Sequence, residues 1–357
     1  GVEPEDVDEN IETLISGGQI RYEFIAGRNA CYLPELYEAE TNAAEILARM
    51  CRRSFGDKAD INKIIAKLEK SQHISYAPLQ KQVLELALKN QVVVLTGGPG
   101  TGKTTSIRAV LAMFDELGMK TLLTAPTGRA AKRMTELTGR EAKTIHRLLE
   151  DEWGEGEEQH FSRNEKNPLN CDVIIVDESS MIDVLLFDSL LKALRLSCRI
   201  ILVGDSDQLP SIGAGNLLND ILTSGIFPSI RLKKVFRQAG RSRIITNAHA
   251  IINGMKPDFS AKDSDCFFMH RADRYSVSRT VLELVCERLP AAYGFDPVKD
   301  IQVLCPSRLL ETGTVNLNNM LQSALNPHTS DKPQLPFKGI FFREGDKVMQ
   351  IKNNYQI

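Results

Sequence analysis

The stretch from Gly97 to Thr105 has residue types and spacing suited to holding a phosphorylated nucleotide, because it fits the pattern G-x-x-x-x-G-K-[ST]. Three of its four glycines are expected to take φ values closed to other residues, which turns backbone N–H groups inward around the α- and β-phosphates. The helix expected from about residue 102 adds the positive end of its dipole. Lys103 can reach the β- and γ-oxygens, and the Thr104 hydroxyl can bind a Mg²⁺ that bridges them. The predicted nucleotide-binding residues are Gly98, Pro99, Gly100, Thr101, Gly102, Lys103, Thr104 and Thr105.

Two adjacent carboxylates, Asp177 and Glu178, directly follow the apolar run at 173–176. A buried strand that ends in this pair would bring Asp177 to the Mg²⁺, directly or through water, and Glu178 to the attacking water. The next apolar run, at 200–203, leads into Gly-Asp-Ser-Asp-Gln, where Gln208 can contact the γ-phosphate and the backbone beyond it. A turn-forming loop is the alternative for Gln208. The carboxylate pair predicts hydrolysis of the bound nucleotide.

The elements that position these residues alternate between strand and helix from residue 77 to about 226. Short apolar runs predict strands at 92–96, 121–125, 173–176 and 200–203, and helical patterns occur at 104–117, 129–137 and 184–194. Continuous apolar strands with intervening helices predict a parallel sheet covered on both faces. Ligands bind such sheets at the carboxyl ends of the strands, where the phosphate loop and the carboxylate pair both lie.

The flanking regions have different patterns. Residues 1–75 predict helices at 6–14, 38–51 and 61–70 and short strands at 19–25 and 30–33, an arrangement that suits a winged-helix-like accessory domain. The run Ile15-Ser16-Gly17-Gly18-Gln19 is similar to the signature loop of ABC transporter ATPases, but it precedes the phosphate loop, so we interpret it as a helix stop. The acidic stretch 151–158 predicts a solvated surface loop. A second α/β pattern begins at about 228, with its clearest strand at 301–304, and a β-rich stretch covers 339–351.

Composition restricts the classes of protein that fit. With 42% apolar and 25% charged residues among 357, the chain is typical of a soluble globular protein, and no apolar run approaches the roughly 20 residues that span a bilayer. We therefore expect a cytoplasmic protein. Seven dispersed cysteines indicate reduced thiols rather than disulfides or zinc ligands.

The net charge of −2 means that any nucleic-acid surface must be local. Two basic segments qualify, with a solvated face as the alternative for either. The first contains Arg129, Lys132, Arg133, Arg140, Lys143, His146 and Arg147, and the second contains Arg231, Lys233, Lys234, Arg237, Arg241 and Arg243.

The order of the motifs resembles that of superfamily 1 DNA helicases, and most of all their RecD-like 5′→3′ branch. The order is the phosphate loop, Ala-Pro-Thr-Gly-Arg at 125–129, the carboxylate pair, Gly-Asp-Ser-Asp-Gln-Leu-Pro at 204–210 and Val-Phe-Arg-Gln at 235–238. The resemblance extends over about 76–325. It implies an α/β fold with a RecA-like P-loop motor domain at 76–228, a partial second RecA-like domain at 229–338 and the start of an SH3-like insertion at 339–357.

The resemblance also implies roles for individual residues. Gln80 matches a glutamine that hydrogen-bonds the adenine edge, with an ordinary surface glutamine as the alternative. Arg237 matches an arginine finger, so that Lys103, Glu178, Gln208 and Arg237 would be catalytic and Thr104 and Asp177 would bind the metal. The implied DNA-binding residues are Thr127, Gly128, Arg129, His146, Pro306 and Arg308. A packing role is the alternative for His146, and the segment 309–313 after Arg308 departs from the Gly-rich continuation usual in the family.

The implied activity is ATP- and Mg²⁺-dependent translocation 5′→3′ along single-stranded DNA. Two later motifs of the family are not found in the sequence, and Gly1 stands where an initiator Met would be, so we expect a fragment that binds nucleotide but does not unwind DNA alone. A GTPase is disfavoured because the chain has no Asn-Lys-x-Asp. The alternatives are a non-translocating, nucleic-acid-stimulated ATPase and a regulatory DNA-binding module.

Overall fold

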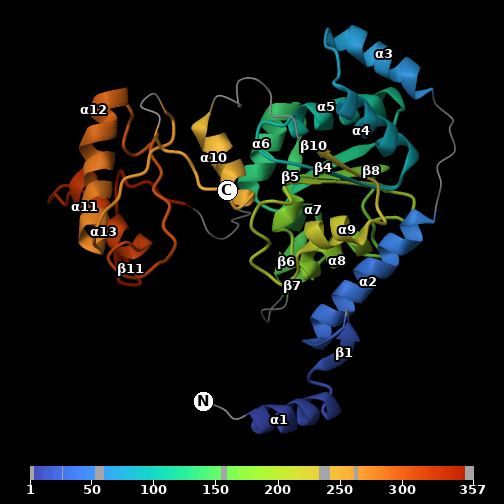
Figure 1. Cartoon of the computed structure of the whole chain (residues 1–357), viewed down its shortest axis with the longest axis horizontal. Coiled ribbons are helices and arrows are strands. Elements are labelled where there is room, and N and C mark those ends of the chain that lie inside the picture. Colours follow the sequence, from blue (N-terminus) through green and yellow to red (C-terminus); the bar gives the residue numbers. More distant parts are fainter. Residues whose placement is uncertain are drawn as a thin grey trace. The chain divides into compact units, whose positions relative to one another are not determined.

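The computed structural model describes residues 4–25, 27–52, 60–153, 159–232, 242–260 and 264–349. The chain divides into two compact units, Gly1–Cys266 and Phe267–Ile357 (Figure 1). The first unit contains the phosphate loop and the carboxylate pair.

A six-stranded parallel sheet forms the centre of the first unit, with the order β10-β3-β9-β8-β4-β5. Its strands are β3 (Val92–Gly97), β4 (Thr121–Ala125), β5 (Ala142–Thr144), β8 (Val173–Val176), β9 (Arg199–Gly204) and β10 (Ser229–Leu232). Every residue of β3, β8 and β9 is buried, because helices cover both faces of the sheet. The predicted parallel α/β sheet is therefore confirmed.

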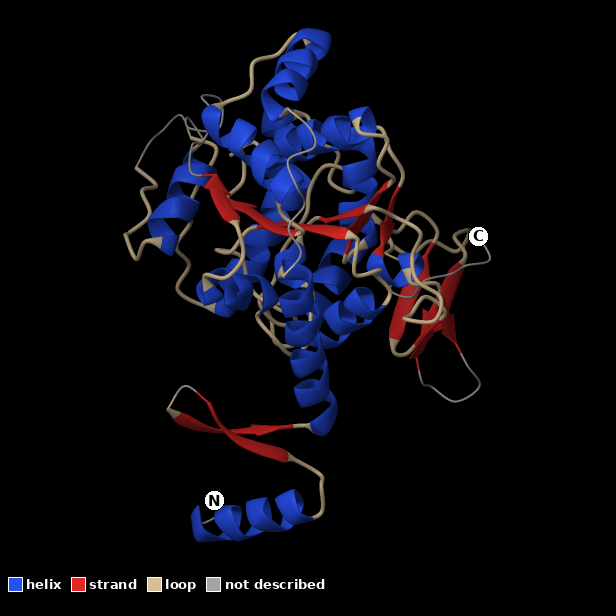
Figure 2. Ribbon diagram, turned by 90° about the vertical axis from the view of Figure 1, so that its right-hand side faces the viewer, coloured by secondary structure: helices blue, strands red, loops and turns tan. Residues whose placement is uncertain are grey.

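Helices lie above and below this sheet (Figure 2). One face is covered by α2 (Pro34–Cys51), α7 (Ile145–Leu148), α8 (Val184–Lys192) and α9 (Leu217–Ser224). The other face is covered by α3 (Ile61–Gln72), α4 (Pro78–Lys89), α5 (Lys103–Glu116) and α6 (Gly128–Thr138). Since successive strand side chains point to opposite faces, Leu202 belongs to the first hydrophobic cluster and Val203 to the second.

The N-terminal elements form as predicted, but they do not all stand apart from the sheet. Helix α1 (Pro4–Ser16) ends in a turn where Gly18 has a φ of 69°, as expected of a helix stop, and β1 (Arg21–Ile25) pairs antiparallel with β2 (Arg28–Tyr32). Helix α2, however, buries Leu47 and Met50 in the cluster that also contains α8. This helix is therefore part of the core of the sheet unit.

Two further parts of the first unit differ from expectation. Strand β10 lies beyond the boundary expected at residue 228 yet pairs with β3, so the first sheet extends to Leu232. The first three residues of the acidic loop expected at 151–158 form β6 (Asp151–Trp153), which pairs with β7 (Gln159–Phe161) just after that stretch. Residues 154–158 lie outside the described part. The 3₁₀ turn η1 (Ser179–Met181) follows the carboxylate pair, and α10 (Arg243–Ile252) is the last helix of this unit.

The described residues of the second unit include several helices and one β-hairpin, joined by long irregular segments. They form α11 (Arg274–Glu283), the π-helical turn η3 (Leu284–Arg288), α12 (Leu289–Tyr293) and α13 (Thr314–Leu325), followed by the hairpin of β11 (Gln334–Phe337) and β12 (Ile340–Arg343). The strand predicted at 301–304 is wrong, because this apolar run forms no ladder with any described segment. Of the β-rich stretch predicted at 339–351, the described part confirms only β12. None of the described helices has the length and apolarity needed to cross a membrane.

Candidate nucleotide-binding site

The phosphate loop connects β3 to α5 and depends on glycine in two ways. Gly100 and Gly102 have φ values of +73° and +93°, in the left-handed region that favours glycine. Gly97 is needed for close approach instead, because a Cβ there would lie 2.7 Å from the carbonyl oxygen of Leu232. Two loop glycines, rather than the expected three, therefore have a positive φ.

Lys103 opens helix α5, and its ammonium group is folded back onto the loop. Its Nζ donates hydrogen bonds to the carbonyl oxygens of Gly97 and Gly98, the second at 3.2 Å. The Thr101 hydroxyl donates to the Gly98 carbonyl at 2.8 Å. In the first turn of α5, Thr104 is partly buried and Thr105 is exposed, and Pro99 in the loop is also exposed. The predicted binding residues thus form one loop at a helix N-terminus, an arrangement that favours phosphate.

The carboxylate pair lies at the end of β8, close to the charge of the phosphate loop. The Asp177 N–H donates to the Thr124 carbonyl of β4, and the Asp177 carboxylate accepts from the Glu178 N–H, both at 2.9 Å. Burial raises the pKa of Asp177, and burial followed by the Asp177 charge raises the pKa of Glu178. The positive charges of Lys103 and Arg133 oppose both shifts. The structure therefore brings the phosphate-loop lysine and the carboxylate pair together.

The loop carrying Gln208 emerges between these two groups, because β9 lies between β3 and β8 in the sheet. The Ser206 N–H donates to the Thr96 hydroxyl at 3.1 Å, which ties this loop to the end of β3. The Ser179 hydroxyl donates to the Val203 carbonyl at 2.9 Å, which ties β9 to the turn after the carboxylate pair. Gln208 itself is exposed.

The side chains present fit a Mg²⁺ held mainly by nucleotide phosphates. Thr104 and Asp177 offer a hydroxyl and a carboxylate, the hard oxygen ligands that Mg²⁺ prefers. Within the described ranges, no group of three His, Cys, Asp or Glu side chains is arranged to hold a metal. A Mg²⁺ at this position would therefore need ligands from the nucleotide and water, as is usual for this ion.

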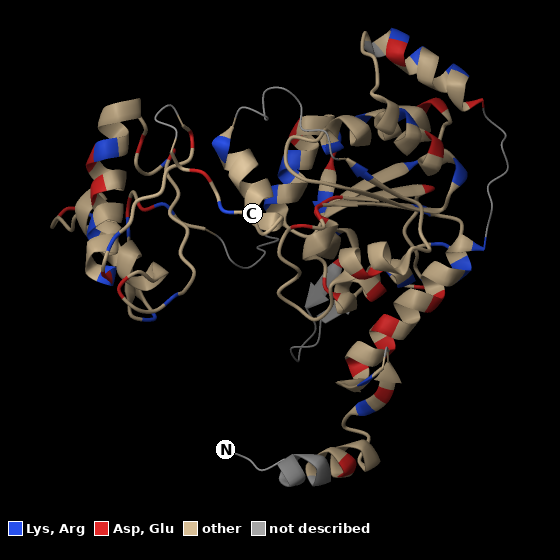
Figure 3. Ribbon diagram, viewed as in Figure 1, with Lys and Arg blue, Asp and Glu red and all other residues tan. Residues whose placement is uncertain are grey.

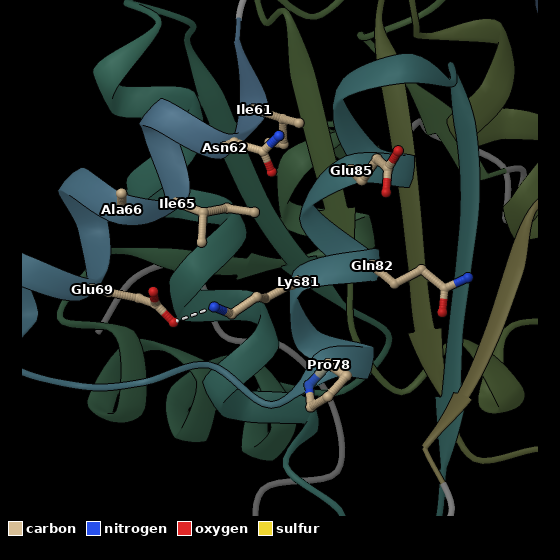
Figure 4. Close-up of a pocket in the computed structure, with 9 residues that line it drawn as sticks. All are labelled: Ile61, Asn62, Ile65, Ala66, Glu69, Pro78, Lys81, Gln82 and Glu85. Atoms are coloured by element: carbon tan, nitrogen blue, oxygen red, sulfur yellow. Dashed lines mark ion pairs between the residues drawn. The ribbon is translucent and has the colours of Figure 1, made fainter.

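Gln80 is buried, with 6% of its surface exposed, so the interpretation as an ordinary surface glutamine is wrong. Its Oε1 accepts a hydrogen bond of 2.9 Å from the Ala77 N–H, which caps helix α4. Contact with adenine stays a prediction. A pocket of about 470 Å³ lies between α3 and α4 (Figure 4). Gln82 lines it, together with Lys81 and Glu69, which form an ion pair of 2.8 Å. None of the predicted site residues lines this pocket.

The predicted DNA-binding residues of the first unit lie around the starts of two helices. The Thr127 hydroxyl accepts from the Ala130 N–H at 3.2 Å and caps α6, where Gly128 and Arg129 are exposed. Lys and Arg residues recur along the ribbon of α6 (Figure 3). His146 packs on Phe161 with ring centroids 6.0 Å apart, so the packing role proposed as its alternative is present.

The remaining predicted residues lie outside the described part of the first unit. Pro306 and Arg308 are exposed in the second unit, which is described by itself. Arg237 lies outside the described residues. Arg133 and His249, conversely, lie at the site although sequence reasoning gave them no role there, because neither belongs to a motif with characteristic spacing.

Comparisons with known proteins agree with this geometry. A family model described as "AAA domain" matches residues 80–214, and one described as "ATP-dependent RecD-like DNA helicase SH3 domain" matches residues 317–357. The "ATP-dependent RecD2 DNA helicase" of Deinococcus radiodurans is 36% identical over 330 residues, which cover 92% of this chain and 43% of that protein. The chain belongs to the RecD-like helicase family.

A second relative of this RecD-like chain is the "RecBCD enzyme subunit RecD" of Mycobacterium tuberculosis. The two sequences are 30% identical over 298 residues, and the match covers 72% of this chain and 50% of the relative. The RecD-like chain thus spans about half the length of the curated relatives it matches. Its sheet is RecA-like, as expected. A crystal structure of the Pif1 helicase from Candida albicans matches weakly, with a TM-score of 0.42 and 22% identity over 73% of this chain and 57% of the other.

Proposed function

We propose that this chain provides the ATP-binding part of a DNA helicase that moves 5′→3′ along single-stranded DNA. The observation that supports this most is the convergence of three motifs on the adjacent strands β3, β9 and β8. The phosphate loop, the Gln208 loop and the carboxylate pair all follow the carboxyl ends of these strands. A site of this kind suits ATP hydrolysis, and the DNA specificity is inferred from the RecD-like family.

Each residue of the site has a chemical task in this proposal. Lys103 and the loop N–H groups neutralise the phosphates, and Thr104 and Asp177 hold a Mg²⁺, which stabilises charge on the β- and γ-oxygens. Glu178 accepts a proton from the attacking water. Gln208 detects whether the terminal phosphate is present, Gln80 contacts the adenine, and Arg237 neutralises charge that develops on the γ-phosphoryl group.

We place the DNA strand against residues that follow the same edge of the sheet. Backbone N–H groups at the start of α6 and the exposed guanidinium of Arg129 suit a phosphate of the DNA backbone. We assign Thr127, Gly128, Arg129 and His146 to this contact in the first unit, and Pro306 and Arg308 to a contact made by the second.

The first experiment measures ATP hydrolysis with and without oligo-dT, using the full-length protein and the 357-residue chain. Stimulation of the full-length protein by single strands, lost in Lys103→Ala, is the expected result. Hydrolysis that single-stranded DNA leaves unchanged would contradict the motor proposal and favour a regulatory module.

The second experiment compares strand displacement by the full-length protein on 5′-tailed and 3′-tailed duplexes. Displacement of the 5′-tailed substrate alone is expected. Stimulated hydrolysis without displacement of either substrate would identify a non-translocating ATPase, and displacement of the 3′-tailed substrate alone would reverse the proposed polarity. We expect the 357-residue chain to bind nucleotide without displacing either strand.

A further inference from the structure

Helix α10 places a histidine directly against the phosphate loop. A Cβ on Gly98 would lie 3.3 Å from the Cε1 atom of His249 and 3.7 Å from its Nε2. Among the described residues, no other heavy atom outside Gly98 and its chain neighbours comes within 4 Å of that position. The imidazole is therefore the described side chain that faces Gly98 from outside the loop.

The Nε2 atom of His249 is buried and has no hydrogen-bond partner within the described part of the chain. Buried imidazole nitrogens normally have a partner, so this atom marks a place where one is expected. The Gly97 and Gly98 carbonyls of the loop already accept hydrogen bonds from Lys103. Nε2 is thus free to bond a ligand that enters the loop.

We propose that His249 is a nucleotide-contacting residue whose Nε2–H donates a hydrogen bond to a phosphoryl oxygen of the nucleoside triphosphate held by the phosphate loop. This inference rests on the nucleotide site of the proposed function. Phosphoryl oxygens are acceptors, which suits an imidazole N–H, and the Lys103 ammonium that reaches the terminal phosphates lies 3.2 Å from the Gly98 carbonyl. The contact is therefore directed at the terminal phosphate rather than at the base.

Side-chain hydrogen bonds attach α10, the helix that carries His249, to neighbouring residues. The Asp265 carboxylate accepts from the Ser242 hydroxyl at 2.6 Å and from the Arg243 N–H at 2.7 Å. The Asn247 side chain exchanges two bonds of 2.9 Å with the backbone of Asp258. These bonds hold the helix that carries His249 to the segment that follows it.

The contact with His249 also explains why a glycine suits position 98. Gly98 does not have a positive φ, so alanine fits its backbone. The atoms that an alanine Cβ would meet belong to His249. A Gly98→Ala substitution should therefore shift the imidazole and weaken its hydrogen bond to the phosphoryl oxygen.

The test measures the affinity of the full chain for fluorescent ADP and for a fluorescent, non-hydrolysable ATP analogue. His249→Ala should weaken the ATP analogue by about tenfold and ADP by much less, because only the triphosphate supplies the terminal oxygen. His249→Gln, which can place an N–H near the position of Nε2, should retain most of the affinity. His270→Ala, an exposed histidine of the second unit, is the matched control and should change neither value.

The outcomes separate this inference from the proposed function. If the parent chain binds neither nucleotide, or Lys103→Ala binds as well as the parent, the proposed site fails. If the parent binds and His249→Ala matches it, the histidine contact alone is overturned. Equal losses in His249→Ala and His249→Gln would show a packing role and also overturn the hydrogen bond. The double variant with Gly98→Ala and His249→Ala should bind no more weakly than His249→Ala, and additive losses would contradict the contact between them.

Discussion

Glu178 combines a strained backbone with a charge that its surroundings disfavour. Its φ of +51° is in the left-handed region that non-glycine residues rarely adopt, and its N–H is held by the Asp177 carboxylate at 2.9 Å. Strain of this kind costs about 1–3 kcal/mol and persists where surrounding bonds enforce it, often at functional sites. This left-handed residue ends the extended path of β8 directly before the 3₁₀ turn η1.

Glu178→Gln should leave nucleotide binding intact and slow hydrolysis by about 10²–10⁴-fold. Glutamine has the same shape and the same backbone cost at this φ, but it cannot accept a proton from water. Single-turnover hydrolysis and fluorescent ADP binding by the full-length protein measure the two effects. Hydrolysis within threefold of the parent would exclude Glu178 as the general base.

At the residue scale, the sequence predicts the groups that belong to spaced motifs and misses those that approach from elsewhere. The phosphate loop and the carboxylate pair are local patterns, and each directly follows the carboxyl end of a sheet strand, as expected. Arg133 and His249 reach the site through the folding of separate helices, and neither has a neighbouring residue that would indicate its partner. Gln80 lies between these two cases. The sequence suggested its role from a motif, but its burial depends on how α4 packs.

Among the elements, helix α2 shows how a helix predicted correctly can belong to another part of the fold. Its amphipathic pattern predicts an apolar face but does not identify what that face contacts. In the structure the face packs on the sheet unit, with Leu47 4% and Met50 1% exposed. The apolar run at 301–304 shows the reverse case, because strand propensity alone supplies no neighbouring strand.

Leu47→Ala should lower the free energy of unfolding of the sheet unit by roughly 2–5 kcal/mol, because it leaves a cavity between α2 and the sheet. Chemical denaturation measures this loss. Glu45→Ala, at an exposed position of the same helix, should change it by less than about 0.5 kcal/mol. Equal stabilities of the Leu47→Ala variant and the parent would mean that α2 does not contribute to this core.

Asp265→Asn should speed amide hydrogen exchange at the first residues of α10 near neutral pH. The Ser242 hydroxyl and then the Arg243 N–H hold the pKa of the Asp265 carboxyl below its usual range, so the stabilisation is present above the ordinary Asp pKa of about 3.9. It is lost as the pH falls through the lowered folded value, where the protonated carboxyl becomes a poor acceptor. The difference between variant and parent should therefore shrink below about pH 4.

A matched control for this helix cap is Asp273→Asn, which removes the carboxylate that caps α11 in the other unit. It should affect α11 and leave the exchange of α10 unchanged. A pH-independent difference at α10 would mean that the Asp265 charge is not what stabilises the helix.

At the scale of the whole molecule, a net charge of −2 means that DNA affinity has to come from a local surface. Several of the basic residues suggested by the sequence already have acidic partners. Arg140 pairs with Asp115, and Arg231 pairs with Asp207 at 2.7 Å. Arg129 at the start of α6 is exposed and has no ion pair within the described part of the chain, so it is the better candidate for a DNA phosphate.

Arg129→Ala should therefore weaken the binding of oligo-dT by the full-length protein and reduce its dependence on salt. Each phosphate contact on single-stranded DNA contributes about 0.7 to the slope of log K against log salt, through the release of a counterion. The variant should show a slope smaller by about that amount. Arg140→Ala is the matched control. It removes a positive charge near the other end of α6, but Asp115 already pairs with that charge, so the salt slope of this variant should equal that of the parent. Identical slopes for all three proteins would place the DNA away from the start of α6. The slope decides this because a lost phosphate contact changes the number of counterions released, whereas the affinity at a single salt concentration does not report that number.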